Sequence, residues 1–211
     1  MALTEIINSI LAFDETATRQ CVQTELDRGT DVMVILNDGL IAAMDEVGRR
    51  YAEAIFFVPE MMMSAQAMKE GLSVLRPHFG DTPFAPKGSI VIGTVKGDHH
   101  DIGKNLVAIM LECAGFSVIN LGKDIEADKF IEAAQQNGAE LIALSALLTT
   151  TLGSMRTTVS KIKTEKNAPK ILVGGAPVTQ AFADSIGADG FSTDATGAVA
   201  VARRLIAIRE N

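Results

Sequence analysis

Apolar positions follow two different patterns along the chain, and the pattern changes near residue 80. From Thr4 to about Phe79 they recur three and four positions apart and never alternate, which is typical of amphipathic helices. Four helices fit, at about 4–12, 15–28, 31–54 and 59–78. They are separated at Asp14, at Gly29-Thr30-Asp31 and just before Pro59, a residue that suits a first helical turn. We therefore expect a small antiparallel four-helix bundle.

After residue 88, short apolar runs alternate with amphipathic stretches. The runs predict strands at 89–95, 116–121, 141–146, 170–173 and about 189–192, and the stretches between and after them predict helices at 103–114, 126–137, 153–166, 178–186 and 196–209. Five alternations of strand and helix imply right-handed crossovers and a parallel sheet. The expected fold is α/β: a helical bundle followed by a Rossmann-like, five-stranded parallel sheet flanked by helices.

The segment "FGDTPFAPKG", 79–88, separates the two patterns. Two prolines and two glycines in ten residues stop helices and favour an extended connection. The predicted organisation is a bundle domain at 1–80, a linker or hinge at 81–88 and a sheet domain at 89–211.

Composition narrows the classes of protein that fit. The net charge of -7 is uneven, since residues 1–80 carry 6 Lys and Arg against 12 Asp and Glu, which argues against nucleic acid or an anionic membrane as a partner of the first half. The two cysteines, Cys21 and Cys113, form no disulfide framework or paired metal-ligand spacing, and we expect both to be buried thiols. The first residues lack a basic leader, and no apolar run has the length of a membrane span. We expect a cytoplasmic protein.

Ligands of parallel sheets bind beyond the carboxyl ends of the strands, where four unusual loops fall, at 96–103, 145–151, 174–179 and 192–196. The first loop lies within "VKGDHHDIGKN", 95–105. Its glycines are spaced wrongly for a phosphate-binding P-loop, and a GxGxxG dinucleotide fingerprint is absent after the first strand. A solvated turn remains an alternative, as does a zinc site, although adjacent residues on one loop rarely supply three ligands to one ion.

A better interpretation of this loop is one metal ligand with one orienting partner. Asp98 and His100 are two positions apart, so in an extended loop the carboxylate can accept a hydrogen bond from one ring nitrogen while the other binds a metal. Gly103 would let a helix begin close to something bulky. No closed set of ligands is available here, so the metal would have to arrive already chelated. His99 is not needed for this arrangement.

Three motifs carry a resemblance to a known family. Asp98-x-His100-x-x-Gly103, followed by Ser145-x-Leu147 and then Gly174-Gly175, resembles the cobalamin-binding signature of base-off, His-on corrinoid proteins. The helical first half is similar to the cap domain of methionine synthase and of the small corrinoid proteins of methylamine, methanol and methoxy-compound methyltransferase systems. The resemblance covers essentially the whole chain.

The resemblance implies a role for each matching residue. His100 would be the lower axial cobalt ligand, Asp98 would orient it, and Thr151 would stand where methionine synthase has a serine that continues this relay. The displaced nucleotide tail would lie against Ser145, Leu147, Thr149, Gly174 and Gly175, with Thr193, Asp194 and Ala195 closing its pocket. Taken singly, the serine, the leucine and the glycines could simply end strands, and the threonines could fill a loop or cap a helix.

The first half would supply a lid over the reactive face of the corrin. Tyr51, Val58 and Met61 match the cap positions of methionine synthase, where the first is a phenylalanine, and an apolar lid would shield the reactive cobalt from water. At least two of Met61, Met62, Met63 and Met68 are expected to be ordinary bundle core. The hinge at 81–88 would let the lid move aside.

The function that the resemblance implies is that of a methyl carrier with no catalysis of its own. A substrate:corrinoid methyltransferase would place a methyl group on cobalt(I), and a second methyltransferase would remove it from methylcobalt(III) to tetrahydrofolate or to a thiol such as coenzyme M. A reductive activase is a further expected partner, whereas nucleic acid and membrane are not. The alternatives are the cobalamin-binding subunit of an adenosylcobalamin-dependent mutase and a cobalamin sensor or regulator.

Overall fold

A computed structural model describes residues 2–79 and 86–207. The chain divides into two compact units, one comprising 1–85 and 113–115, the other 86–112 and 116–211. Most of the hinge predicted at 81–88 lies outside the described residues. Within the described part of the chain, no helix is long and apolar enough to cross a membrane.

The first unit is helical, as the spacing of its apolar residues predicts. Its helices are α1 (Ala2–Leu11), α2 (Glu15–Asp27), α3 (Val32–Val34), α4 (Ala42–Ala52) and α5 (Val58–Leu75), with a 3₁₀ turn at Arg76–Phe79. Asp14 and Asp31 accept hydrogen bonds from the first free N–H groups of α2 and α3, so the two predicted breaks are helix caps. Of the two cysteines, Cys113 is buried as expected, but Cys21 is only half-buried.

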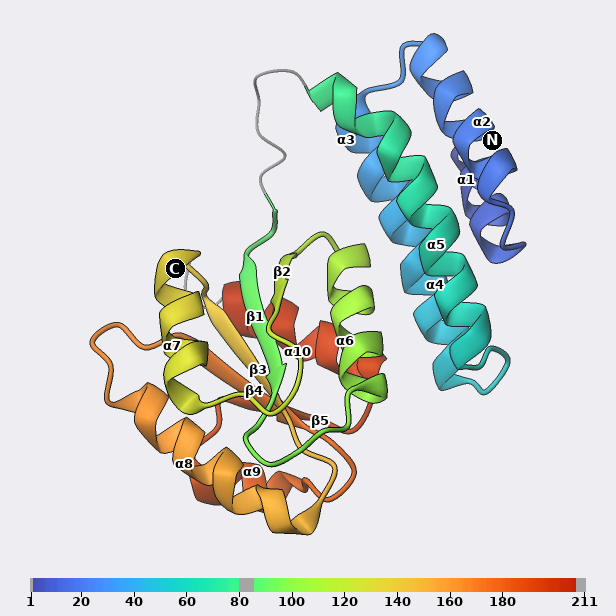
Figure 1. The fold of residues 1–211 in the computed structure, drawn as a ribbon. Helices are drawn as coiled ribbons and strands as arrows, with labels where there is room; N and C mark the ends of the chain where they lie inside the picture. Colours follow the sequence, from blue (N-terminus) through green and yellow to red (C-terminus); the bar gives the residue numbers. More distant parts are fainter. Residues whose placement is uncertain (1, 80–85, 208–211) are drawn as a thin grey trace. The chain divides into compact units, whose positions relative to one another are not determined.

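The predicted helix 31–54 is one helical rod with a wider turn inside it. Between α3 and α4, residues Ile35–Ile41 form a π-helix, in which the N–H of Ala42 donates to the carbonyl of Asn37, five residues back. Figure 1 shows α3 and α4 in line, with α4 beside α5. The wider turn lets both apolar pairs, Ile35-Leu36 and Leu40-Ile41, be buried although they are five positions apart.

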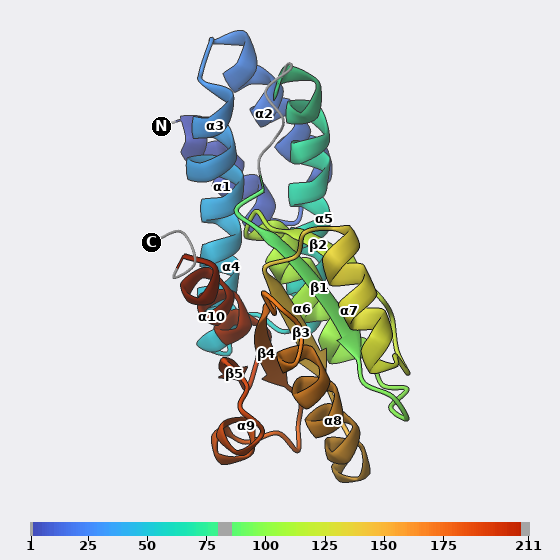
Figure 2. The ribbon, with the colours of Figure 1, turned by 90° about the vertical axis from the view of Figure 1, so that its left-hand side faces the viewer.

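The second unit contains the predicted parallel sheet. Its strands are β1 (Ser89–Thr94), β2 (Ser117–Asn120), β3 (Leu141–Ser145), β4 (Lys170–Gly174) and β5 (Gly190–Ser192), in the order β2-β1-β3-β4-β5. All neighbouring pairs are parallel, and Figure 2 shows β1 between β2 and β3. The helices are α6 (Ile102–Cys113), α7 (Ala127–Gln136), α8 (Leu152–Lys163), α9 (Gln180–Ile186) and α10 (Ala195–Ala207). The predicted strands and helices are all present, most with bounds shifted by one or two residues.

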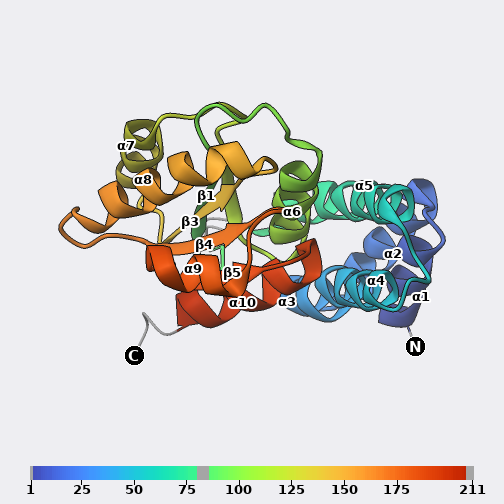
Figure 3. The same ribbon diagram turned by 90° about the horizontal axis from the view of Figure 1, so that it is seen from below.

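Helices cover both faces of this sheet, with α7 and α8 along one face and α10 along the other (Figure 3). On the first face, alternate strand residues pack against helix residues in one apolar core that includes Val91, Ile142, Val173, Phe130, Met155, Val159 and Ala183. Two strand glycines permit the close approach of helices. A Cβ at Gly93 would lie 2.7 Å from the Phe130 ring of α7, and one at Gly190 would lie 2.5 Å from Val201 of α10.

Candidate cofactor site

The strand register brings the predicted motifs together at the carboxyl edge of the sheet. Thr94 at the end of β1 pairs with Ser145 at the end of β3, Ser145 pairs with Gly174 at the end of β4, and Gly174 pairs with Ser192 of β5. The loops that follow β1 and β3 therefore start side by side. This adjacency places Asp98 within reach of residues 147–151.

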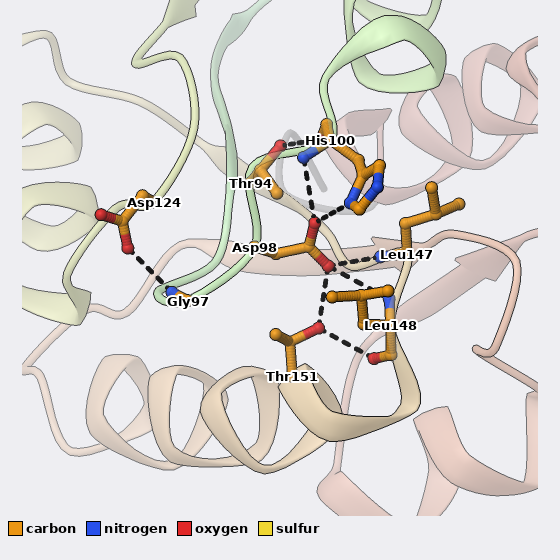
Figure 4. Close-up of polar contacts among 8 residues, drawn as sticks. All are labelled: Thr94, Gly97, Asp98, His100, Asp124, Leu147, Leu148 and Thr151. Atoms are coloured by element: carbon orange, nitrogen blue, oxygen red, sulfur yellow. Dashed lines mark hydrogen bonds and ion pairs between the residues drawn. The ribbon is translucent and has the colours of Figure 1, made fainter.

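The Asp98 carboxylate is the centre of the site (Figure 4). Its side chain is completely buried and accepts five hydrogen bonds. Oδ1 accepts from the backbone N–H of His100 at 3.1 Å and from its ring Nδ1 at 2.9 Å. Oδ2 accepts from the N–H groups of Leu147 at 2.7 Å and Leu148 at 3.2 Å, and from the Thr151 hydroxyl at 2.8 Å.

These donors decide the ionisation of Asp98 and, through it, the tautomer of the His100 ring. Burial alone raises the pKa of Asp98, but the hydrogen bonds from Leu147, from the backbone and ring of His100 and from Thr151 outweigh it and lower the pKa well below its usual range. The carboxylate is therefore ionised, and a carboxylate oxygen can only accept. In the neutral imidazole of His100 the proton then sits on Nδ1, which leaves the lone pair of Nε2 for a metal. The contact that the sequence predicted between Asp98 and His100 is present.

Further hydrogen bonds hold the His100 loop in place. The hydroxyl of Thr94 donates to the carbonyl of His100 at 3.0 Å, and the N–H of Gly97 donates to the Asp124 carboxylate at 2.8 Å. Lys96 forms an ion pair with the same carboxylate. His99 is exposed to solvent. The imidazole of His100 is thus fixed from both ends of its loop.

The surface around His100 is open and apolar. The His100 side chain is 50% exposed. Ile102, two positions further along the chain, has an exposed apolar side chain, as do Leu147 and Leu148, whose N–H groups donate to the same Asp98 carboxylate as His100. A Cβ built on Gly103, the second residue of α6, would meet nothing within 4 Å. A free imidazole nitrogen beside open apolar surface suits a flat chelated metal better than a hydrated ion. Among the described residues, no three His, Cys, Asp or Glu side chains come together as a metal site.

The residues assigned to the nucleotide tail lie along the same edge. Ser145 is half-buried, and Thr149 is exposed in a 3₁₀ turn, Thr149–Thr151, that leads into α8. Thr151 does not cap α8, because its hydroxyl is directed to Asp98 and to the carbonyl of Leu148. The alternative of a simple helix cap is therefore wrong for this residue.

Gly174, the last residue of β4, and Gly175, which follows it, must lack a side chain for a reason that the sequence did not reveal. Gly175 has φ +123°, and a Cβ there would lie 1.9 Å from the carbonyl oxygen of Ala146. A Cβ on Gly174 would lie 3.0 Å from the carbonyl oxygen of Ser192. The backbone of Ala146 and Ser192 therefore occupies the space beside these glycines, which we expected the nucleotide tail to occupy.

The last predicted segment begins α10. Thr193 and Asp194 are exposed, and Ala195 is buried. The Asp194 carboxylate accepts from the N–H of Gly197 at 2.7 Å, so it caps the helix.

Sequence reasoning missed a buried lysine next to the motif. Lys104 is 3% exposed, and its ammonium donates to the side-chain oxygens of Asn105 and Asn120, at 2.5 and 2.7 Å. Burial lowers the pKa of Lys104, and the charge of Asp101 opposes this only in part. The cluster ties the first turn of α6 to the end of β2. A lysine following a glycine carries no sequence signal of burial, so only the fold could reveal it.

The three residues matched to the lid belong to the helical unit. Tyr51 in α4 and Val58 at the start of α5 are half-buried, whereas Met61 is completely buried. Met68 is also core, which confirms that at least two of the four methionines are. The exposed apolar side chains of this region are different ones, namely Ile55, Phe57, Met62 and Met63.

Comparison with known proteins bears on the cofactor. Residues 88–202 match the family model described as a B12 binding domain, and residues 2–76 match a second model of the same description. The chain is 41% identical over 210 residues to a corrinoid protein of Desulfitobacterium hafniense strain Y51, covering 97% of both chains. It is 45% identical over 176 residues to the dimethylamine corrinoid protein of Methanosarcina barkeri, covering 82% of this chain and 83% of that one. This chain belongs to the B12-binding corrinoid proteins.

A solved structure agrees with this assignment. A chain in the methanol:cobalamin methyltransferase complex MtaBC from Methanosarcina barkeri superimposes with a TM-score of 0.87 at 30% identity, over 98% of this corrinoid protein and 80% of that chain. The donor set found here also fits a corrinoid. It offers one imidazole nitrogen with a fixed tautomer, an open space at Gly103 and exposed apolar side chains beside it.

Proposed function

We propose that this corrinoid protein is the methyl carrier of a methyltransferase system. The single observation that carries the proposal is the fixed tautomer of His100, which presents one nitrogen to a chelated cobalt. The relatives are corrinoid proteins of dimethylamine and trimethylamine systems, and one solved relative is part of a methanol methyltransferase complex. When bound, the corrinoid supplies a cobalt that accepts and releases a methyl group.

In this proposal the chain's own residues ligate, orient and enclose the cofactor. His100 would ligate the cobalt, Asp98 holds the imidazole proton on Nδ1, Thr151 donates to the other oxygen of Asp98, and Gly103 would leave room for the corrin. Ser145, Leu147, Thr149, Gly174 and Gly175 would border the nucleotide tail, and Thr193, Asp194 and Ala195 would close its pocket. Tyr51, Val58 and Met61 belong to the lid.

The proposed partners are a substrate:corrinoid methyltransferase, a corrinoid:acceptor methyltransferase and a reductive activase. A lid over the cofactor would have to move aside for each partner.

Reconstitution with hydroxocobalamin tests the ligand assignment. Wild type and His99→Ala should retain the corrinoid, and after reduction to cobalt(II) their electron paramagnetic resonance spectra should show coupling to one histidine nitrogen. His100→Ala should lose that coupling. His99 is a matched control because it is exposed and directly precedes His100 in the same loop. An unchanged spectrum in His100→Ala would overturn the assignment.

The carrier role needs a separate measurement. Loaded and reduced protein is incubated with methyl-labelled dimethylamine, trimethylamine or methanol and the methyltransferase of each system. Label should appear on the protein with one of these pairs and leave it when the acceptor methyltransferase is added. No label from any of them would contradict the proposal.

A further inference from the structure

The β2–α7 loop, residues 121–126, runs alongside the end of β1. The N–H of Thr94 donates to the carbonyl of Gly122 at 3.0 Å, and the N–H of Ile125 donates to the carbonyl of Thr94 at 3.0 Å. These two backbone hydrogen bonds bring Asp124 beside the turn that follows β1.

Asp124 holds both ends of the dipeptide Gly97-Asp98. Its carboxylate accepts from the N–H of Gly97 at 2.8 Å, and its own N–H donates to the carbonyl of Asp98 at 3.0 Å. Figure 4 shows Asp124 reaching this turn from the side away from Leu147 and Leu148. Asp124 has φ +60°, a left-handed conformation that, glycine apart, Asp and Asn adopt more readily than most residues.

Gly97 is the point at which this loop has the most freedom to move. Its φ is +84°, and a residue without a Cβ has access to more backbone conformations than any other. Within the turn itself, the N–H of Asp98 donates to the carbonyl of Val95 at 3.1 Å. Rotation about the Gly97 backbone would displace everything that follows it, including His100 three positions later.

We propose that Asp124 is a positioning residue for the cobalt ligand: by clamping Gly97, it keeps the imidazole of His100 in the place where it ligates. The inference rests on the proposed function, since it takes His100 as the ligand. Without the clamp, only a fraction of the molecules would present the imidazole correctly, and ligation would weaken in proportion to that fraction.

The ion pair of Asp124 with Lys96 is secondary to this clamp. The Lys96 ammonium lies 3.3 Å from the carboxylates of both Asp124 and Glu126, and its side chain is half exposed. Exposed ion pairs of this kind contribute little. The hydrogen bond from Gly97 is the largest of the effects that lower the pKa of Asp124. Removing the lysine should therefore matter less than removing the carboxylate.

Three substitutions separate the parts of the clamp. Asp124→Gly removes the acceptor but keeps the N–H and tolerates the left-handed conformation. Asp124→Asn keeps an acceptor oxygen and also tolerates that conformation, whereas Lys96→Met removes only the ion pair. Asn167→Gly is the matched control, because it introduces glycine at another left-handed position, φ +63°, in the turn before β4.

Cyanide displacement measures ligation directly. In protein loaded with cyanocobalamin, added cyanide competes with the imidazole for cobalt, and the visible spectrum reports the dicyano form. A hydrogen bond to a charged group typically changes an equilibrium by a factor of about ten or more, so Asp124→Gly should be displaced at about one tenth of the cyanide concentration that wild type needs. Asp124→Asn, Lys96→Met and Asn167→Gly should stay within about threefold of wild type.

Hydrogen exchange of the cofactor-free protein tests the clamp without a corrinoid. The amide of Gly97 should exchange at least about tenfold faster in Asp124→Gly than in wild type. The amide of Thr94, which donates to the Gly122 carbonyl, is an internal reference and should not change. Equal exchange of the Gly97 amide in both proteins would overturn the proposal.

The outcomes separate this inference from the proposed function. If wild type retains no corrinoid, or if its cobalt carries no histidine nitrogen, the proposed function fails. If cyanide displaces the imidazole from wild type and from Asp124→Gly at the same concentration, the function stands and the positioning role is wrong. The role is also wrong if Asp124→Asn weakens ligation as much as Asp124→Gly does. Urea unfolding of each variant shows that the comparison is made on folded protein.

Discussion

Replacing Gly103 with alanine should separate folding from cofactor binding. Gly103 is the second residue of α6, it has no left-handed backbone conformation, and a Cβ there would meet nothing within 4 Å. Alanine is favoured over glycine inside helices by about 1 kcal/mol, and a position in the first turn should gain only part of that. The free energy of unfolding of the cofactor-free protein should therefore stay constant or rise by up to about 1 kcal/mol.

The same methyl group should hinder the corrin. It would stand in the open space at Gly103, three residues after His100, where the proposed cofactor would pack closely. Forcing one extra carbon into a close-packed contact typically costs about 1–3 kcal/mol, so the affinity for hydroxocobalamin should fall by about 5- to 150-fold. Urea unfolding of the cofactor-free protein measures the first effect, and a visible-light titration with hydroxocobalamin measures the second.

Gly153 offers a control at an equivalent place. It is the second residue of α8, and a Cβ there also meets nothing within 4 Å. Gly153→Ala should change stability as Gly103→Ala does but should bind the corrinoid like wild type. The reasoning is refuted if Gly103→Ala binds as tightly as wild type, or if both variants lose the same affinity.

Three further results follow from the backbone and from buried charges. Gly175→Ala should lower the free energy of unfolding by at least about 3 kcal/mol, because its Cβ would lie 1.9 Å from the Ala146 carbonyl oxygen and φ is positive; a loss under 1 kcal/mol in urea would contradict this. Asp98 has a lowered pKa, so the stability that its ionised form contributes is present above about pH 4 and is lost as the pH falls further. The difference in unfolding free energy between wild type and Asp98→Asn, measured with urea, should therefore narrow below about pH 4, and a constant difference would argue against an ionised Asp98. Lys104 has a pKa lowered by burial, so the unfolded state binds the proton more tightly and the free energy of unfolding should rise as the pH approaches about 10. Lys104→Met should remove that rise, and the same dependence of stability on pH in both proteins would refute the prediction.

The fold could be predicted because its periodicities are local. Runs such as 89–94 indicate a strand, and the amphipathic stretches after them indicate helices, each within a few residues of sequence. The alternation of the two then implies a parallel sheet. The π-helix at Ile35–Ile41 was not predicted, since two apolar pairs five positions apart also fit a longer, broadly buried α-helix. Its widened turn depends on packing within the bundle, which no window of sequence contains.

The site was predictable where side chains carry the chemistry. Asp98 and His100 are both recognisable, and their spacing predicts the contact that is present. The N–H groups of Leu147 and Leu148 were not predictable as donors, because every residue except proline has one and only the adjacency of β1 and β3 directs them to Asp98. The main role found for Gly175 was likewise hidden, since the carbonyl that requires it belongs to Ala146, in the loop after β3.

The amino ends of the strands carry none of the proposed site residues. All the proposed site residues of the second unit lie at the carboxyl ends of the strands, whereas Lys166 is exposed in the turn before β4. The five residues of β4 separate the two edges by about 17 Å. A fluorophore or surface linker placed at Lys166 would report on docking without touching the cofactor, so the architecture provides a handle for watching partner exchange in real time.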